Sequence, residues 1–446
     1  MKKVLLFLLV VLMYIPARAG DYYSYQYEGQ TLSYDLFPDG TCELLQSLAS
    51  GNLIVPSIVE REIGGNVYEY EVTRIGDAAF SWCSDLVSVE LPNTIQSIGE
   101  DAFHACESLT SIKLPEYLST LGEGAFRDCE SLTSIILPNS LIKIEQLTFL
   151  GCSSLSAITL PNALTSIGRL AFNDCRSLTT IDIPDTVTFI GISAFESCSK
   201  LSSITLPKSL KTIEESTFSN CTGLQSINIP DAVTGIGGSA FYYCTSLHTV
   251  TIGNSVESIG NSAFYDCKKL TKLSLGNSVK SIGHEAFSEC EKLEDFTFPE
   301  SLTKIGEFAF ERCRSLTTID IPSSVTDLGQ GSFNECKSLN SIYYNSENPI
   351  QGDETIFDYD TYNTAVLYVP ASAVEKCKTI NPWMNFKSIN AADFSGVSDI
   401  TAGADETKTV EVYNMAGVKV AESTQGITPG IYLVREGSDV KKVIIK

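Results

Sequence analysis

Twelve cysteines recur at a constant interval of 23 residues, from Cys83 to Cys336. A Phe stands three residues before each of them and a Leu three residues after, as in Phe103, Cys106 and Leu109. A fixed period of about 20 to 50 residues is typical of solenoids and propellers, and it limits the fold more than any other feature of this chain. These units occupy about three-fifths of the 446 residues.

Each unit combines two hydrophobic periods. The stretch from Ala102 to Leu109 places apolar residues at helical spacing and predicts a short helical turn. The stretch from Ser111 to Leu114 alternates and predicts a short strand with Ile and Leu pointing inward. Pro follows in nine of the twelve units and ends the strand, because it has no amide hydrogen to donate. A unit this small cannot bury its own apolar face, so we expect stacked copies to bury it against one another.

The repeated unit has a recognisable pattern. The segment Leu86–Leu91 fits the leucine-rich repeat pattern L-x-x-L-x-L. The longer segment Ile98–Pro115 resembles the BspA-like leucine-rich repeat family of bacterial surface proteins. This resemblance implies an α/β repeat solenoid, a right-handed curved array of twelve units over residues 72–344, on a secreted or surface-attached protein. It implies adhesion as the function of some members and carries over no catalytic residues, because the family motif contains none.

Two units depart from the motif in a paired way. The Gly four residues before the Phe is replaced by Glu145 and Glu214, and in the same units the preceding Ala becomes Thr148 and Thr217. Because Glu adopts a positive φ only at a cost, this position is not expected to require one. The pairing indicates contact, and we expect each Glu carboxylate to accept a hydrogen bond from its Thr hydroxyl or from amides at the helix start.

The first nineteen residues read as a secretory signal peptide. Lys2 and Lys3 are followed by the apolar run Val4–Ile15 and by the small-x-small cleavage site Ala17–Ala19. The apolar run is shorter than the roughly twenty residues that span a bilayer. We therefore expect cleavage, secretion to the extracellular space or outer cell surface, and no membrane span in the mature chain.

The ends of a solenoid need caps that cover its exposed core. Residues 20–71 contain turn signals between strand-like runs and predict an N-terminal β-hairpin cap. Residues 345–392 predict a C-terminal cap in which Trp383 and Phe386 cover the last repeat. Residues 393–406 are rich in Ser, Gly, Asp and Thr and predict a linker.

The last forty residues lose the repeat and carry no Cys. Alternating segments broken by turn signals predict a small all-β module over residues 407–446. The segments Val412–Gly417, Pro429–Tyr432 and Lys442–Lys446 resemble the C-terminal sorting domain of the type IX secretion pathway. That resemblance implies export across an outer membrane; an ordinary β module is the alternative.

Fourteen Cys in a secreted chain raise the question of disulfides. In a stack, each Cys has two equivalent neighbours with parallel side chains, so nothing selects a partner. A buried thiol ladder is therefore the favoured interpretation, and one or more disulfides remain the alternative. A zinc site is disfavoured because the sequence has no C-x-x-C and only three His.

Composition excludes several classes of function. A formal charge of −23 argues against nucleic acid or an anionic membrane as the partner. Ser and Thr recur without a nearby His, so no nucleophile–base pair, catalytic residue, metal or cofactor is expected. A carboxylate-dependent hydrolase has less support, because acids such as Glu90 and Asp182 lie four units apart.

Outward positions of the strands form the first candidate binding surface. They carry small hydroxyls with scattered charges, and the residues singled out for ligand contact are Lys113, Asp182, Thr205 and Asp320. Tyr343 closes this predicted concave face at the last strand. The alternative is that Ser and Thr only suit a solvated strand face.

Aromatic residues form the second candidate surface. Tyr242, Tyr243 and Tyr265 fall on the predicted convex side of adjacent units, and Trp82 holds the position of Tyr243 in the first unit. Exposed aromatic clusters can mark binding patches. The alternative is that they are scattered aromatics that shield the turns.

The sequence as a whole favours a monomeric binding protein at the cell surface that adheres to a host extracellular protein or glycan. A passive surface spacer or scaffold is the alternative that the sequence leaves open.

Overall fold

The computed structural model describes residues 21–392, residue 394 and four strands near the C-terminus. The chain forms two compact units, Met1–Cys175 and Arg176–Lys446. The predicted signal peptide 1–19, and the predicted linker 393–406 apart from residue 394, lie outside the described residues. In this described part of the chain, no helix is long and apolar enough to cross a membrane.

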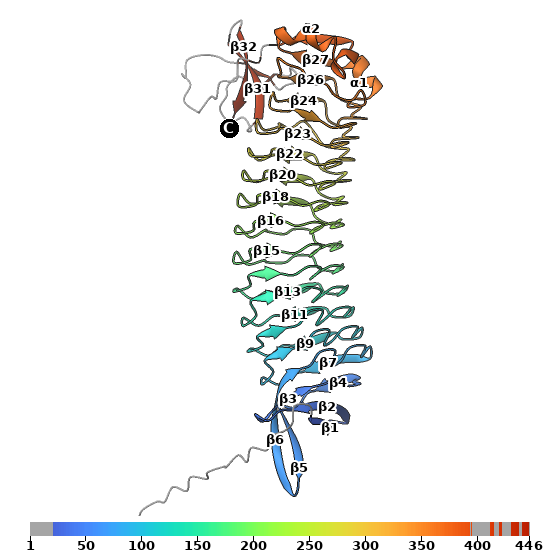
Figure 1. Cartoon of the computed structure of the whole chain (residues 1–446), viewed down its shortest axis with the longest axis vertical. Coiled ribbons are helices and arrows are strands. Elements are labelled where there is room, and N and C mark those ends of the chain that lie inside the picture. The colour runs from blue at the N-terminus through green and yellow to red at the C-terminus, as the bar shows by residue number, and fades with distance from the viewer. Residues whose placement is uncertain are drawn as a thin grey trace, which may run out of the picture. The chain divides into compact units, whose positions relative to one another are not determined.

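Both units are solenoids of stacked coils, as the sequence predicts (Figure 1). Each coil runs parallel to the next, and residues pair with partners 23 positions further on, as in Ser88 with Ser111 and Ser226 with Thr249. One short strand precedes the Phe of a coil and another follows its Cys. The parallel pairing at the repeat length excludes the propeller alternative.

The first unit begins with six strands and continues with the strands of the coils. The N-terminal strands are β1 (Asp21–Tyr27), β2 (Gln30–Leu36), β3 (Thr41–Leu44), β4 (Gly51–Ile54), β5 (Ile58–Ile63) and β6 (Asn66–Ile75). The coil strands are β7 (Leu86–Glu90), β8 (Ser97–Ile98), β9 (Ser111–Lys113), β10 (Thr120–Leu121), β11 (Ser134–Ile136), β12 (Lys143–Ile144), β13 (Ala157–Thr159) and β14 (Ser166–Ile167).

Two antiparallel hairpins, β1–β2 and β5–β6, lie at the N-terminal end of this unit. Between them, β3 runs parallel to β6 and β4 runs parallel to β7. Through these parallel pairs, residues 41–54 form an additional coil that precedes the first Cys-containing coil in the stack. Strands β6 and β7 of the first Cys-containing coil are therefore paired on this side, by β3 and β4.

The second unit continues the same pattern. Its coil strands are β15 (Phe189–Ile190), β16 (Thr212–Ile213), β17 (Ser226–Asn228), β18 (Gly235–Ile236), β19 (Thr249–Thr251), β20 (Ser258–Ile259), β21 (Lys272–Ser274), β22 (Ser281–Ile282), β23 (Lys304–Ile305), β24 (Thr318–Ile321), β25 (Asp327–Leu328) and β26 (Ser341–Tyr344). Its closing elements are α1 (Tyr359–Thr364), β27 (Val366–Val369), η1 (Ala371–Ala373), α2 (Val374–Cys377), η2 (Trp383–Asn385) and β28 (Ser388–Ala391).

Aromatic packing closes the end of the second unit. Strands β27 and β28 extend the parallel sheet beyond β26. The ring of Trp383 stacks on Tyr344 with centroids 4.3 Å apart, and its indole nitrogen donates a hydrogen bond to the carbonyl of Ile350 at 2.8 Å. Phe386 packs edge-on against Phe357.

The C-terminal module contains four described strands. They are β29 (Glu411–Tyr413), β30 (Lys419–Ala421), β31 (Gly430–Glu436) and β32 (Asp439–Ile445). They form one antiparallel sheet in the order β30-β29-β31-β32.

The core of each unit is a set of columns, one residue per coil. In the first unit the rings of Phe103 and Phe126 stack with centroids 5.3 Å apart, and in the second those of Phe241 and Phe264 are 4.9 Å apart. The Phe, Cys and Leu of the motif are buried in every coil. Full burial of a Leu or Phe side chain contributes about 1.5–3 kcal/mol, so these columns stabilise the stack.

The predicted helical turn around the Phe is wrong. Residues two positions before and two positions after each Phe have a positive φ, as in Asp101 at 51° and Ala105 at 55° around Phe103. A right-handed helix cannot continue through such residues. Between them the amides alternate: Ser81 donates to Ala78 within the coil, whereas Phe80 donates to Ala102 of the next coil at 2.7 Å. This segment is therefore a third intercoil ladder.

In ten of the twelve coils a Gly stands four residues before the Phe, where the backbone approaches the preceding coil closely. None of these glycines has a positive φ. A Cβ on Gly99 would lie 2.6 Å from the amide nitrogen of Asp77 in the preceding coil. The prediction for the two exceptional coils is partly wrong. Each Thr hydroxyl donates to the backbone carbonyl of its Glu, from Thr148 to Glu145 at 2.8 Å, rather than to the carboxylate. The Glu145 carboxylate pairs instead with Lys143.

Candidate functional site

The strand face holds five of the residues singled out from the sequence. In the first unit, Lys113 ends β9 with an exposed side chain and lies in register with Glu90 of β7. In the second unit, Asp182 and Thr205 are both exposed and pair through an isolated parallel bridge. The placement of these side chains agrees with the predicted alternation, in which inward neighbours are buried.

Asp320 and Tyr343 lie side by side at the far end of the second unit. They are in register between β24 and β26, and both are half-buried. The Tyr343 ring stacks on Tyr368 with centroids 4.7 Å apart. Burial, followed by the neighbouring Tyr368 and Asp320, raises the pKa of Tyr343 above its usual range. The Tyr343 hydroxyl therefore stays protonated and can donate a hydrogen bond.

Many hydroxyls of the strand face serve the fold. The Thr110 hydroxyl donates to the carbonyl of Val87 in the preceding coil at 3.2 Å, and that of Ser156 donates to Thr133 at 3.1 Å. Hydroxyls at a second repeat position make the same kind of bond, as in Ser119, which donates to the carbonyl of Gln96 in the preceding coil at 3.0 Å. These hydroxyls stabilise the stack, so the surface offers fewer hydroxyls to a ligand than the sequence suggests.

The tyrosines singled out on the turns form a packed cluster. The rings of Tyr242 and Tyr265 stack with centroids 5.1 Å apart, and Tyr243 lies 4.5 Å from Tyr242 and 6.0 Å from Tyr265. Tyr243 is exposed and the other two are half-buried. In the first unit Trp82 is 70% exposed and its ring lies edge-on to His104 at 5.0 Å.

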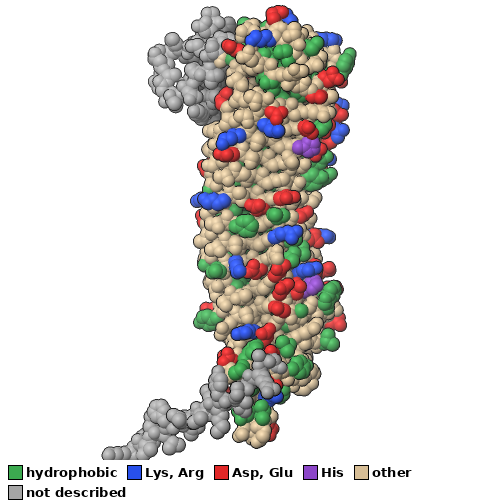
Figure 2. Space-filling model, in the orientation of Figure 1, with side chains coloured by type: hydrophobic (Ala, Val, Ile, Leu, Met, Phe, Trp, Pro, Cys, Tyr) green, Lys and Arg blue, Asp and Glu red, His purple; other side chains and the backbone are tan. Residues whose placement is uncertain are grey.

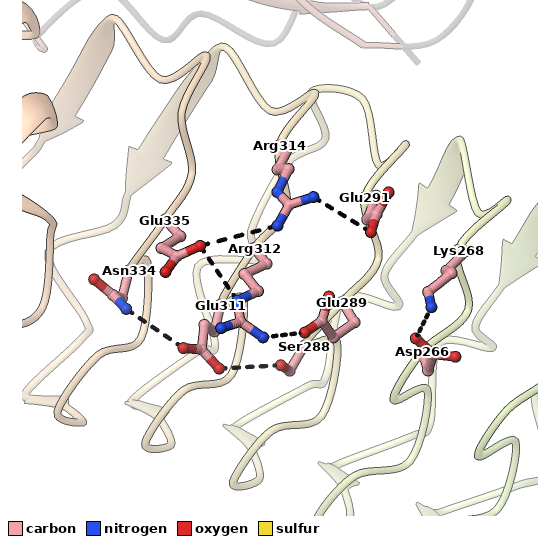
Figure 3. Close-up of polar contacts among 10 residues, drawn as sticks. All are labelled: Asp266, Lys268, Ser288, Glu289, Glu291, Glu311, Arg312, Arg314, Asn334 and Glu335. Carbon is pink, nitrogen blue, oxygen red and sulfur yellow. Dashed lines mark hydrogen bonds and ion pairs between the residues drawn. The ribbon is translucent and has the colours of Figure 1, made fainter.

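Sequence reasoning missed a charged network on the turns of the second unit. Figure 3 shows Arg312 placed between Glu289 and Glu335, with its Nε 3.3 Å from the latter. Arg314 lies 3.5 Å from Glu291 and 3.9 Å from Glu335. The hydrogen bond that Arg312 donates to the Glu289 carboxylate raises the pKa of the Arg312 guanidinium. These residues occupy equivalent positions in successive coils, so reading the turn columns across the repeat would have found the network.

A smaller pair adjoins this network in Figure 3. The side chain of Asp266 is only 6% exposed and pairs with Lys268 at 3.0 Å. The hydrogen bond to Asp266 raises the pKa of Lys268. The face drawn in Figure 2 carries acidic and basic side chains mixed together, with apolar side chains scattered among them.

The structure brings His104 close to a Ser and an Asp, although the sequence showed no sign of a His beside a hydroxyl. In the first unit Nδ1 of His104 lies 3.4 Å from the Ser81 hydroxyl, and Nε2 lies 3.4 Å from the Asp128 carboxylate. A hydrolytic triad also needs free donors to stabilise an oxyanion. The amides of residues 81, 82 and 83 all donate to backbone carbonyls. The arrangement therefore lacks an oxyanion hole at Ser81.

The cysteines of the described chain lie away from solvent. All fourteen are free and buried. The Cys106 thiol donates to the carbonyl of Phe80 at 3.2 Å, and burial raises its pKa to about 12. A thiol with such a pKa stays protonated, whereas metal binding and nucleophilic attack need the thiolate. No group of three His, Cys, Asp or Glu in residues 21–392 is arranged to hold a metal ion.

Sequence reasoning also missed a hollow on the first unit. It has a volume of 780 Å³ and is lined by side chains that include Lys113, Tyr117, Ile136 and Asn139. Tyr117 is 70% exposed and Ile136 is 72% exposed. Comparison of the repeats with one another would have revealed this hollow, because Tyr117 and Ile136 stand where most other repeats carry small or polar residues.

Comparison with known proteins gives a family and several solved structures with sequence similarity. The family model described as the BspA type leucine rich repeat region (6 copies) matches residues 73–199, 165–278 and 257–381. No curated protein matches the chain. The family is one of repeat proteins, and no enzyme family is indicated.

Three solved structures illustrate the similarity. A leucine rich cell surface protein from Faecalibacterium prausnitzii is 27% identical, with 72% of this chain and 94% of that chain covered and a TM-score of 0.47. A leucine-rich repeat protein from Bacteroides ovatus is 25% identical, with 83% and 100% covered and a TM-score of 0.42. The pneumococcal vaccine antigen PcpA is 17% identical, with 84% and 100% covered and a TM-score of 0.39.

The family model spans more than half of the chain, and its matches fall on the stacked coils described above. The chain belongs to the BspA-type leucine-rich repeat family.

Proposed function

We propose that this chain is a secreted or cell-surface binding protein that adheres to a host extracellular protein or glycan through the exposed faces of its coils. One observation carries the proposal. Inward strand positions are apolar in every coil, whereas the outward position two residues before the Pro varies, with Glu90, Lys113, Ile136 and Asp182 among its occupants. A constant frame with variable outward side chains suits recognition of a partner.

The ends of the chain support a surface location. The predicted signal peptide 1–19 directs export. The resemblance of the C-terminal module to a type IX sorting domain supports passage across an outer membrane, and the antiparallel sheet β29–β32 suits an independent module. We propose that the mature chain is a monomer, with no nucleic acid or membrane lipid as its partner.

The test is binding of the purified chain to immobilised host matrix proteins and to a glycan array. A variant with Thr205→Trp and Thr251→Trp adds bulk to outward strand positions of the second unit. Thr222→Trp, at an exposed turn position of the same unit, is the matched control. Binding by the wild type that is lost only in the first variant supports this function. Attachment that no surface variant alters would support a passive spacer instead.

A further inference from the structure

We propose that the first unit carries a docking site for a protein segment that presents an aliphatic or aromatic side chain flanked by Lys or Arg. This inference rests on the proposed binding function and names its site and partner chemistry. The site is the Tyr117 hollow, defined as the 780 Å³ hollow together with the adjoining 510 Å³ hollow, which shares Asn93 and Tyr117 with it. Its volume suits a few side chains of a bound segment.

Tyr117 breaks a rule that the repeat otherwise keeps. At ten equivalent positions between the two ends of the array the residue is small: Thr94, Ser140, Ala163, Thr186, Ser209, Ala232, Ser255, Ser278, Ser301 and Ser324. The hydroxyl at this position stabilises the stack, because Thr94 donates to Val72 at 2.6 Å and Ser140 donates to Leu118 at 2.5 Å. Tyr117 gives up that interaction and places a large ring in solvent instead.

Two isoleucines in neighbouring coils break the repeat in the same way. Ile136 holds an outward strand position that is occupied elsewhere by Glu90, Lys113, Thr159, Asp182, Thr205, Asn228, Thr251, Ser274, Thr297, Asp320 and Tyr343. Ile142 holds a position that is polar in every other coil, and it is 56% exposed. It follows Ser140, which lines the hollow, by two residues. Three exposed apolar departures within adjoining coils do not serve the core, since none of them is buried.

The chemistry of these side chains favours a protein over a sugar. The two isoleucines have no hydrogen-bonding groups and no ring face on which a sugar can stack, so they gain only from contact with apolar groups. Tyr117 adds a rigid aromatic surface of the kind that dominates protein interfaces. Asn93, Ser111 and Asn139 supply a polar rim that can bond to a peptide backbone.

The charges around the hollow select the flanks of the partner. Glu71 and Glu116 line the two hollows and Glu90 lies in register beside Lys113. No ion pair between described residues involves the three glutamates or Lys113. Around the Tyr117 hollow, these acidic side chains outnumber the basic one. The whole chain is also acidic, with a formal charge of −23. Basic residues beside the apolar anchor would be attracted to this surface.

The repeat itself supplies the variants for the test. Tyr117→Ser, Ile136→Thr and Ile142→Thr each install a residue that other coils carry at the same position, so the triple variant should fold. Phe189→Thr is the matched control, because Phe189 is also an exposed large apolar residue, at a position where six other coils carry Ser or Thr. It belongs to the second unit.

The probe is a random-peptide library displayed on phage, panned on the full chain with the triple variant as counter-selection. We expect enriched peptides in which an aliphatic or aromatic residue stands beside Lys or Arg. A synthetic peptide of that sequence should bind the triple variant at least about tenfold more weakly than the wild type, the scale of one lost anchor contact. Phe189→Thr should bind it as the wild type does.

Three results would overturn the assignment. Enriched peptides that bind wild type and triple variant equally would remove the site, as would a failure of any peptide to be enriched. A glycan that binds the wild type but not the triple variant would make the partner a saccharide. A dimer of the wild type that the triple variant loses in sedimentation would make the occupant a second copy of the chain. Binding to matrix proteins that the triple variant retains would leave the proposed function standing while removing this site from it.

Discussion

The thiol of Cys106 donates a hydrogen bond to the carbonyl oxygen of Phe80, one coil earlier, at 3.2 Å. The same bond recurs in both units, for example from Cys129 to Phe103 and from Cys244 to Phe218. These thiols therefore act as hydrogen-bond donors inside the core.

These thiols should make the fold sensitive to alkaline pH. Burial raises the pKa of Cys106 from 9.0 to about 12, so the folded state keeps its proton while the unfolded state loses it. The contribution to stability is complete below about pH 9 and is lost as pH rises toward 12. Urea unfolding across this range should show a falling free energy of unfolding. Equal stability at about pH 9 and about pH 12 would contradict the burial of protonated thiols.

Chemical labelling tests the burial of the thiols independently. A thiol reagent should label the native chain slowly and the unfolded chain fully.

Gly260 should not tolerate a methyl group. A Cβ there would lie 2.5 Å from the amide nitrogen of Gly238 in the preceding coil, so Gly260→Ala should destabilise the chain by about 1–3 kcal/mol. Gly235→Ala is the matched control, because its Cβ would lie 3.4 Å from the Ser258 hydroxyl, which can move. Urea unfolding measures both variants. An equal effect of the two would show that close approach does not explain the glycine.

Ser239 should gain stability when it becomes glycine. Its φ of 53° lies in the left-handed region, which costs a residue with a Cβ about 1–2 kcal/mol. Part of this gain is offset by the greater backbone freedom of Gly in the unfolded chain, so we expect Ser239→Gly to stabilise by up to about 1 kcal/mol. Ser239→Val should destabilise, because a β-branched residue fits that region poorly. Melting temperatures that fall in Ser239→Gly would contradict this reading of the turn.

Arg312 should contribute a salt-dependent stability. Arg312→Met leaves Glu289 and Glu335 without the guanidinium between them, and we expect a loss of about 0.5–1 kcal/mol for these partly exposed pairs. High salt screens both the attraction and the remaining repulsion, so the difference from wild type should shrink. Unfolding in low and high NaCl measures this. A difference that is independent of salt would point to lost packing instead.

The columns of the core followed from the sequence because burial obeys a repeat that can be read directly. Phe103, Cys106 and Leu109 were expected inside, and all three are fully buried. Their spacing of three residues also matched a helix, and that inference failed. The residues that break the helix, such as Asp101 and Ala105, have side chains with no common feature that marks a positive φ.

The exposed surface was predicted less well, for two physical reasons. Contacts such as Ser81 with His104 depend on how neighbouring coils are aligned across the turns, which a single unit does not reveal. Hydroxyls such as that of Thr110 looked available for a ligand, but they bond to the coil before. Tyr117, in contrast, could have been found by aligning the units with one another, since it is the one aromatic residue at its repeat position.

The amide of Phe80 bonds to Ala102 and that of Phe241 bonds to Ala263, so each coil depends on its immediate neighbours through one recurring set of bonds. Removal or duplication of one whole repeat would join surfaces that already match. A gene of this kind can therefore lengthen or shorten its product by unequal recombination. Each such event would change the number of outward positions open to selection and leave the interior packing as it was.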